Sequence, residues 1–308
     1  GDEVIISGLT FVADLNVTVI TGAIPIIADC KSLDDWNVSA KDIETKISSK
    51  TKAMIIVHFA GYPCDMQEIM AVAKKHNIVV IEDSAHSIGA EYQGRKCGAI
   101  ADIGCFSFFS NKNLATGEGG MVVCKTEELD KKARSLRSHG MTSMTIQRHS
   151  GNIISYDVLE PGFNYRFDEI RAALGIVQLE KLDAHNAKRA AIVTRYIEAL
   201  QELKYVIVPW DSGYVHGRPS FHIFPILLPA DVDRTAVVQQ LQQKGIQTSI
   251  HYPAFSQFTY YHGKLNCHIP VAEEISKRVL TLPLYPTMQI DNVEFISASL
   301  KEILNGMQ

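Results

Sequence analysis

The residues best suited to chemistry in this sequence are a carboxylate, a hydroxyl and an amine that accompany two apolar runs. Asp83 closely follows the β-branched run 78–81, Ser107 lies within the run 104–109, and Lys112 follows that second run. Such runs are typical of buried parallel strands. In open α/β sheets, reactive groups gather just beyond the carboxyl ends of the strands. We therefore expect Asp83, Ser107 and Lys112 to meet at one edge of a sheet.

This set of side chains matches what pyridoxal 5′-phosphate (PLP) requires of a protein. A carboxylate such as Asp83 keeps the pyridine nitrogen protonated, so that the ring acts as an electron sink. A lysine amine such as Lys112 forms the Schiff base, and a hydroxyl such as Ser107 can bind the phosphate, as can backbone N–H groups. Taken singly, each residue has an ordinary alternative role as a helix cap or a surface charge. It is the combination that indicates a cofactor site.

The sequence around these residues resembles the DegT/DnrJ/EryC1/StrS family of PLP-dependent nucleotide-sugar aminotransferases. The resemblance rests on blocks that occur in the family's order: residues 82–86 (EDSAH), 106–108 (FSF) followed by 112–113 (KN), 117–120 (GEGG), 162–166 (GFNYR), 178–182 (QLEKL), 251–253 (HYP) and 282–286 (LPLYP). It implies fold type I, the fold of aspartate aminotransferase. In that α/β fold, a large domain with a mostly parallel, doubly wound sheet precedes a smaller α+β domain.

The resemblance also implies roles for single residues. Phe11 would stack on the pyridine ring, and His86 would lie near the phenolic oxygen of the cofactor. Asn164 would reach the cofactor phosphate of a neighbouring subunit, which implies a homodimer with shared active sites. The alternatives are a core aromatic at Phe11, a half-exposed loop histidine at His86 and a turn residue at Asn164. Family members usually carry a small hydroxyl residue where Asp14 stands.

The reaction that the resemblance implies is the transfer of an amino group to a nucleotide-linked keto-sugar, as in the biosynthesis of polysaccharide or antibiotic sugars. Lys112 would hold PLP as a Schiff base in a ping-pong mechanism, and its freed amine would move the proton. L-glutamate would be the usual amino donor. Sugar 3-dehydratases of the same fold replace this lysine with histidine, so Lys112 disfavours that alternative. A non-catalytic regulatory relative is a third reading, because the chain begins at Gly1 where family members carry a further N-terminal portion; the intact Asp83, Ser107 and Lys112 set argues against it.

Composition disfavours several other classes of protein. The chain has 30 Lys plus Arg against 34 Asp plus Glu, with no basic run that would suit a nucleic acid. Its six cysteines show no paired spacing and no metal-site spacing. The longest apolar stretch, residues 17–28, is too short to span a bilayer. We therefore expect a cytoplasmic protein that binds no metal, membrane or nucleic acid.

The chain length of 308 residues suggests two domains, and the pattern changes near Lys204. We expect a large PLP-binding domain at 1–200, with its N-terminal portion missing, and a small α+β domain at 201–308. Alternating strands and helices predict the parallel sheet of the first domain. Its predicted strands are 4–7, 25–28, 53–58, 78–83, 103–109 and 121–124, and its predicted helices lie around Asn16, at 40–47, after Asp65, at 127–138 and at 168–200.

The last of these helices should bury an apolar face of Ile170, Ala173, Leu174, Val177 and Leu182. Residues 141–159 are polar and irregular, which predicts a mobile loop near the site. In the second domain we expect strands at 206–209, 221–227 and 247–250 and helices at 233–244 and 293–304.

Overall fold

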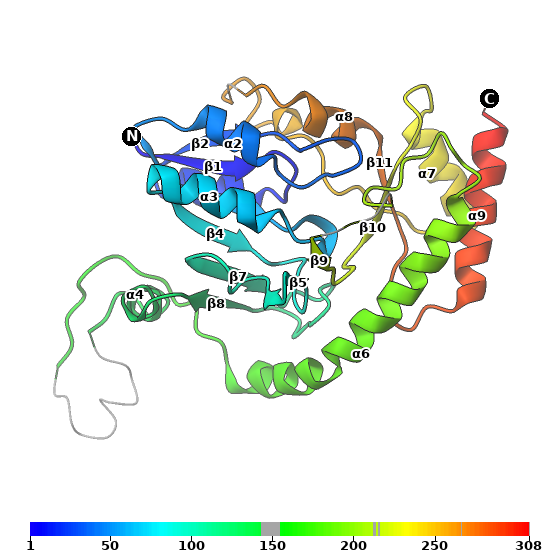
Figure 1. Cartoon of the computed structure of the whole chain (residues 1–308). Helices are drawn as coiled ribbons and strands as arrows, with labels where there is room; N and C mark the ends of the chain where they lie inside the picture. Colours follow the sequence, from blue (N-terminus) through cyan, green and yellow to red (C-terminus); the bar gives the residue numbers. More distant parts are fainter. Residues whose placement is uncertain (143–154, 212–213, 215, 266, 308) are drawn as a thin grey trace.

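A six-stranded sheet forms the centre of the larger part of the molecule (Figure 1). The structure is a computed structural model that describes residues 1–142, 155–211, 214, 216–265 and 267–307. In sheet order the strands are β2 (Ile24–Ala28), β1 (Glu3–Ser7), β3 (Thr51–Val57), β4 (Val79–Asp83), β7 (Ile103–Ser107) and β8 (Gly120–Cys124). Neighbouring strands are parallel except for β7 and β8. The predicted mostly parallel sheet is therefore confirmed.

Helices cover both faces of this sheet because successive strand residues point to opposite sides. Ile5 and Met54 face a core shared with two helices, whereas Ile6 and Ile55 face a second core on the other side. The first core includes α2 (Ala40–Lys46) and α3 (Met66–His76), and the second includes α1 (Ala13–Ile20) and α8 (Pro270–Arg278). The helix α4 (Glu127–Leu136) contacts the edge strand β8. Burial on both faces explains why the strands are continuous apolar runs.

A second unit forms around the C-terminal half of the long helix α6 (Glu169–Leu200), at the right of Figure 1. Tyr196 of α6 stacks on Phe224 with ring centroids 4.6 Å apart, inside a core that also contains Leu280 and Leu300. The other elements of this unit are β10 (Phe224–Leu227), β11 (Val279–Leu282), α7 (Arg234–Gln243) and α9 (Ile290–Asn305). The predicted domain boundary at residue 200 stays a prediction. The helix α6 precedes that boundary but contributes to the core of the second unit, whereas α8 follows it and packs on the large sheet.

Short elements connect the two units. They are η1 (Phe59–Gly61), η2 (Phe255–Gln257) and a small sheet of β5 (Glu91–Tyr92), β6 (Arg95–Lys96) and β9 (Gly217–Arg218). In that sheet β5, which precedes α6 in the sequence, pairs with β9, which follows α6. This pairing links the segment after β4 to the segment that enters the second unit.

Several predictions for the second unit were wrong. Single bridges at Ile207 and Ser249 replace the strands expected at 206–209 and 247–250, and the strand expected at 221–227 begins only at Phe224. An apolar run specifies burial, but a ladder also needs a neighbouring strand that stays alongside for several residues. Each of the two stretches pairs with the β10–β11 sheet at a single residue only. We did not predict α8 or β11.

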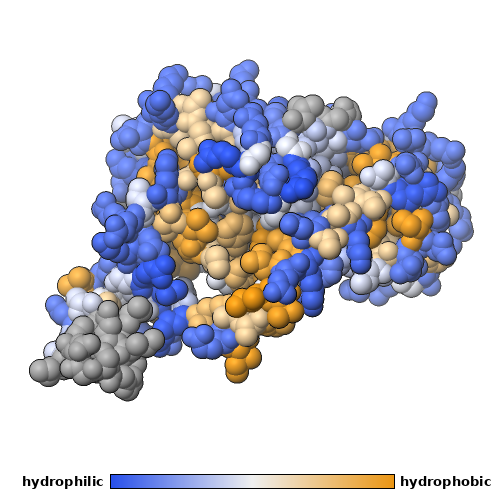
Figure 2. All heavy atoms as spheres, turned by 60° about the horizontal axis from the view of Figure 1, so that its bottom comes forward, coloured by the Kyte–Doolittle hydropathy of each residue, from blue (hydrophilic) through white to orange (hydrophobic). Residues whose placement is uncertain are grey.

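The first half of α6 does not pack as predicted. Of the expected apolar face only Leu182 is buried, while Ile170 is 84% exposed and Ala173, Leu174 and Val177 are also exposed. Figure 2, which turns the lower side of Figure 1 forward, shows hydrophobic surface gathered around a hollow on this side. No helix in the described ranges could cross a membrane on the basis of its length and apolar character. Among the described residues, the first half of α6 is thus left largely exposed.

Behind the predicted site, a fully buried carboxylate anchors the end of β4. Glu82 accepts hydrogen bonds from His58 Nε2 at 3.0 Å and from the backbone N–H groups of Gly98 (2.7 Å), Ile100 (2.7 Å) and Ala101 (2.6 Å). Burial raises the pKa of Glu82, but the bonds from His58 and from the backbone outweigh burial, and the pKa lies below its ordinary value. The charged carboxylate thus holds the 98–101 turn against the strand.

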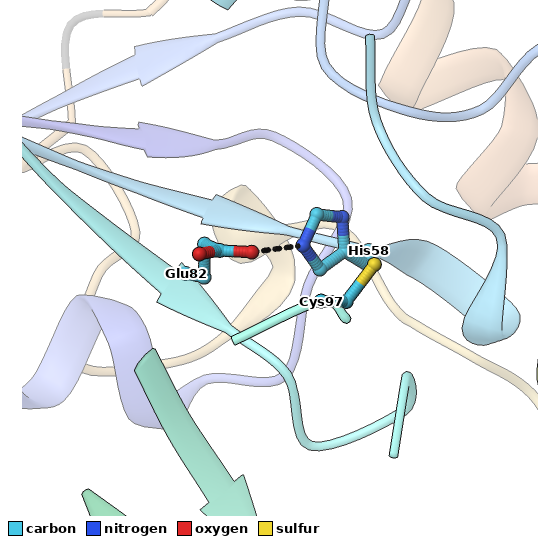
Figure 3. A group of neighbouring side chains, drawn as sticks. All are labelled: His58, Glu82 and Cys97. Carbon is cyan, nitrogen blue, oxygen red and sulfur yellow. Dashed lines mark hydrogen bonds and ion pairs between the residues drawn. The ribbon is translucent and has the colours of Figure 1, made fainter. Parts of the chain in front are cut away.

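His58, Glu82 and Cys97 form a buried cluster whose residue types would suit a zinc ion (Figure 3). Their ligand atoms lie within 4.8 Å of one another. However, His58 Nδ1 accepts the N–H of Cys64 at 3.0 Å, so the ring proton lies on Nε2 and points to Glu82. The roughly four acceptor positions of the Glu82 carboxylate are then occupied. We interpret this cluster as structural.

We expect Glu82→Gln to lower the free energy of unfolding by about 3 kcal/mol, because it places amide hydrogens against buried N–H donors and removes a charge that they stabilise. Chemical denaturation at pH 7 measures this change. Since the folded-state pKa is depressed, the Glu82 contribution is present above pH 4.5 and is lost as pH falls through the folded pKa. The variant should therefore lose less stability than the wild type below pH 4.5. Glu128→Gln, exposed on α4, is the control, and equal stability of both variants would contradict the structural role.

Candidate active site

A cavity of about 620 Å³ lies at the carboxyl ends of β3, β4 and β7. Its walls bring together five of the six predicted site residues, namely Phe11, Asp83, His86, Ser107 and Lys112. Segments far apart in the sequence supply them, because the carboxyl ends of parallel strands meet at one sheet edge. The proximity of these residues is a finding; their roles remain predictions.

Asp83 and Lys112 face the same cavity and influence each other's ionisation. Desolvation raises the pKa of Asp83, while the N–H of Ala85 at 2.9 Å and the charge of Lys112 oppose that rise. Burial lowers the pKa of Lys112 to about 8, although the Asp83 charge opposes the fall. Lys112 is positioned by a turn after β7, in which its N–H donates to the Phe109 carbonyl at 2.9 Å. The pair offers a carboxylate and an amine with a substantial neutral fraction near pH 7.

Ser107 and Phe11 contribute to the walls of the cavity in different ways. Ser107 is the last residue of β7, and its Oγ accepts the N–H of Phe109 at 3.3 Å, so the hydroxyl proton is free to donate. Phe11 is 57% exposed, with its ring centroid 5.7 Å from that of Tyr252. The alternative of an ordinary core phenylalanine is therefore wrong. Phe11 presents an aromatic ring to the cavity.

His86 is buried, which excludes the alternative of a half-exposed loop histidine. Its Nε2 lies 2.9 Å from the Tyr252 hydroxyl, whereas its buried Nδ1 has no partner among the described residues. Burial lowers the pKa of His86 well below its ordinary value, and electrostatic interactions with His222 and Lys112 lower it further. A neutral imidazole with one unsatisfied nitrogen therefore borders the cavity.

The sequence did not identify several residues that the structure places in or beside the site. Asp14 lines the cavity and accepts the Thr10 hydroxyl at 2.8 Å; burial and then the Asp83 charge raise its pKa well above the ordinary value. The only indication in the sequence was that family members usually carry a small hydroxyl residue at the position of Asp14. His251 and Tyr252 also line the cavity, but the HYP block gave no reason to choose either side chain.

The cavity residues fit PLP. A cavity of this size is ordinary for a small-molecule site. In the described residues the only hydrogen bond to the Asp83 carboxylate comes from Ala85, so acceptor positions remain for a ring nitrogen. The Nδ1 of His86 is an orphaned polar atom that a bound polar group could satisfy. Lys112 and Ser107 then offer an amine for the aldehyde carbon and a hydroxyl for the phosphate.

The structure does not bring Asn164 into this cavity. Asn164 is exposed, forms an isolated bridge with Ser138 and does not line the cavity. Its predicted role in a neighbouring subunit stays a prediction. Of the loop expected at 141–159, Thr142 pairs with Asp157, and residues 143–154 lie outside the described residues.

Comparison with known proteins agrees with this geometry. The model of the DegT/DnrJ/EryC1/StrS aminotransferase family matches residues 1–301. Among curated relatives, the UDP-N-acetyl-3-dehydro-alpha-D-glucosamine 3-aminotransferase of Acidithiobacillus ferrooxidans is 39% identical over 99% of this chain and 79% of its own length. The spore coat polysaccharide biosynthesis protein SpsC of Bacillus subtilis is 38% identical over 99% of this chain and 80% of its own.

Solved structures share the fold. The aminotransferase PseC of Helicobacter pylori, involved in the biosynthesis of pseudoaminic acid, matches with a TM-score of 0.91 and 28% identity over 99% of this chain and 80% of that chain. The Streptococcus pneumoniae protein Spr1654, assigned as a sugar aminotransferase and solved in its PLP form, matches with a TM-score of 0.90 and 27% identity over 100% of this chain and 82% of that chain. This chain therefore belongs to the DegT/DnrJ/EryC1/StrS aminotransferase family, a family of PLP-dependent sugar aminotransferases.

Proposed function

We propose that the protein moves an amino group from an amino acid, with L-glutamate as the usual donor, to a keto-sugar linked to a nucleotide. The observation that carries this proposal is the pair of Asp83 and Lys112 in one cavity, with the pKa of the amine lowered to about 8. The names of the relatives support a nucleotide-linked sugar as the acceptor. The choice of L-glutamate and the cytoplasmic location rest on the family resemblance.

The chain's own side chains divide the work. PLP, when bound, draws electrons from the α-carbon of the donor. Asp83 would hold a proton on the ring nitrogen, and Ser107 Oγ would donate to the phosphate. Lys112 Nζ would hold PLP through the aldehyde carbon and, as a free amine, would accept the proton of the donor's α-carbon. At a pKa of about 8, roughly a tenth of Lys112 is neutral at pH 7, about 300-fold more than for an ordinary lysine.

We further propose that two copies of the chain associate through the exposed side of α6. Ile170 is 84%, Ile176 63% and Leu179 58% exposed on the first half of this helix. On the preceding segment the rings of Phe163 and Tyr165 stack at 4.9 Å and are both exposed. Exposed apolar side chains gathered on one part of the surface are typical of an interface. Asn164 lies between these two rings in the sequence, which supports its predicted role at the site of a second subunit.

Wild-type protein loaded with PLP should show a visible absorption band that bleaches on addition of L-glutamate and returns on addition of the keto-sugar. Lys112→Ala should retain no PLP after borohydride reduction and denaturation, because the covalent bond to Nζ cannot form. Lys125→Ala removes an exposed amine that pairs with Asp102 at 3.2 Å and is the matched control. Covalently fixed PLP on Lys112→Ala, or a wild-type band that no amino acid bleaches, would contradict the proposal.

The rate at which cofactor-free protein captures PLP should rise about tenfold per pH unit and level off above about pH 8, because only the neutral amine of Lys112 reacts. Stopped-flow absorbance at several pH values measures this rate. The Asp83 charge raises the pKa of Lys112, so Asp83→Asn should move the inflection to lower pH. Asp102→Asn, remote from the cavity, should leave it in place. An inflection near pH 10 would show that Lys112 is not desolvated.

A mixture of Lys112→Ala and Asn164→Ala chains tests the shared site. If Asn164 serves the other subunit, one site of each mixed dimer combines an intact Lys112 with an intact Asn164. We expect about a quarter of wild-type activity after the chains are unfolded and refolded together, and nearly none from either variant alone. No recovery in a mixture whose dimers are verified by differently tagged chains would contradict the role of Asn164.

A further inference from the structure

A second, smaller pocket adjoins the cavity on the side of the C-terminal unit. Its volume is about 200 Å³, roughly the space of six or seven water molecules. It shares Asn111 and His251 with the cavity that contains Lys112, and its polar walls include His222 and Thr281. Among the described residues no Asp, Glu, Lys or Arg side chain lines it. The side pocket thus offers hydrogen bonds without charge.

A chain of side-chain amides decides which nitrogen of His222 carries the ring proton. Asn186 Nδ2 donates to the Ile88 carbonyl at 3.1 Å, so Asn186 turns its Oδ1 to Asn113 Nδ2 at 2.9 Å. Asn113 Nδ2 also donates to the Ser220 carbonyl at 2.8 Å, which leaves Asn113 Oδ1 facing His222 Nδ1 at 3.0 Å. That oxygen can only accept a hydrogen bond, so Nδ1 is the protonated nitrogen.

The other ring nitrogen, His222 Nε2, is therefore a hydrogen-bond acceptor. It has no hydrogen-bond partner in the part of the chain that the structure describes, although the residue is only 4% exposed and lines the side pocket. Burial, followed by the charges of Lys112 and Arg189, lowers the pKa of His222 well below 6.5. The ring stays neutral near pH 7 and holds a fixed acceptor beside the Lys112 cavity.

We propose that the side pocket binds the uncharged, hydroxyl-bearing ring of the sugar substrate, with His222 Nε2 accepting a hydrogen bond from a sugar hydroxyl. This inference rests on the proposed function and assigns the sugar side of that site. A hydroxyl supplies the donor that Nε2 needs, and the neutral hydroxyl and amide groups of the pocket suit other hydroxyls. The carboxylate of an amino donor would meet no cation there, because Arg189 donates to the carbonyls of His222 and Leu284 at 3.1 Å and does not line the pocket.

Two substitutions at His222 separate its two hydrogen bonds. His222→Asn can keep an N–H near the Nδ1 position, toward Asn113, but has no atom at the Nε2 position. His222→Gln reaches the Nε2 position with an acceptor oxygen. Calorimetry with UDP-, dTDP- and GDP-linked hexoses measures sugar affinity. We expect His222→Asn to bind the hexose roughly tenfold more weakly than the wild type, as for one lost hydrogen bond. His222→Gln should recover part of that affinity.

Thr248→Val is the matched control. The Thr248 hydroxyl is buried and has no hydrogen-bond partner among the residues that the structure describes. Thr248 does not line the side pocket, although Gln247 and Ser249 on either side of it do. Its substitution should leave sugar affinity unchanged. As a second readout, ¹⁵N spectra of histidine-labelled protein should show Nε2 of His222 unprotonated, and a bound hexose should shift that resonance.

The outcomes separate this inference from the proposed function. Unchanged affinity in His222→Asn, or an unmoved Nε2 resonance in a complex that forms, would overturn the inference and leave the proposed function standing. A loss of L-glutamate affinity with sugar affinity retained would also overturn it. Wild-type protein that binds none of the nucleotide hexoses would contradict the proposed function, and the inference with it.

Discussion

The active site depends on two consecutive carboxylates at the end of β4 that point in opposite directions. Because side chains alternate across a strand, Glu82 enters the core while Asp83 faces the cavity. Four hydrogen bonds offset the cost of burying the Glu82 charge and tie the 98–101 turn to the strand. The hydrogen bonds of Glu82 therefore fix the end of the strand that carries Asp83, which holds the Asp83 carboxylate in a defined position relative to Lys112.

Contacts from the second unit complete the cavity. His86 follows β4 and lies between two residues of the later chain, the Tyr252 hydroxyl at 2.9 Å and the His222 ring at 4.5 Å. Asn113, next to Lys112, is bonded to Ser220 and His222. These hydrogen bonds involve Asn113, the residue next to Lys112, so residues that follow α6 in the sequence orient the loop that carries the amine. Hydrophobic packing brings the units together, but it is non-directional, and the hydrogen bonds select the orientation.

The exposed half of α6 connects the fold to assembly. One helix supplies both a buried end, at Tyr196, and an apolar end in solvent, at Ile170. A helix with an apolar face is stabilised mainly by packing of that face, so the exposed first half of α6 receives less support from packing than the second half. A second copy would cover this face and place the exposed segment around Asn164 near another cavity. Assembly and catalysis would then depend on the same surface.

The sequence by itself determined the mostly parallel sheet, the positions of its strands along the chain and the meeting of five site residues. Buried parallel strands leave long apolar runs, and their carboxyl ends must coincide, so Asp83, Ser107 and Lys112 could be placed together without coordinates. Their roles and the domain boundary stay predictions.

Only the tertiary structure decided the rest, because it depends on contacts between distant segments. The apolar pattern of α6 could not show which half finds a partner, and the runs at 206–209 and 247–250 could not show that a neighbouring strand is missing. Nothing in the residues around His222 predicts its tautomer. Asn186, Asn113 and Ser220 fix that proton from positions up to 109 residues away along the chain, a distance that local sequence patterns do not encode.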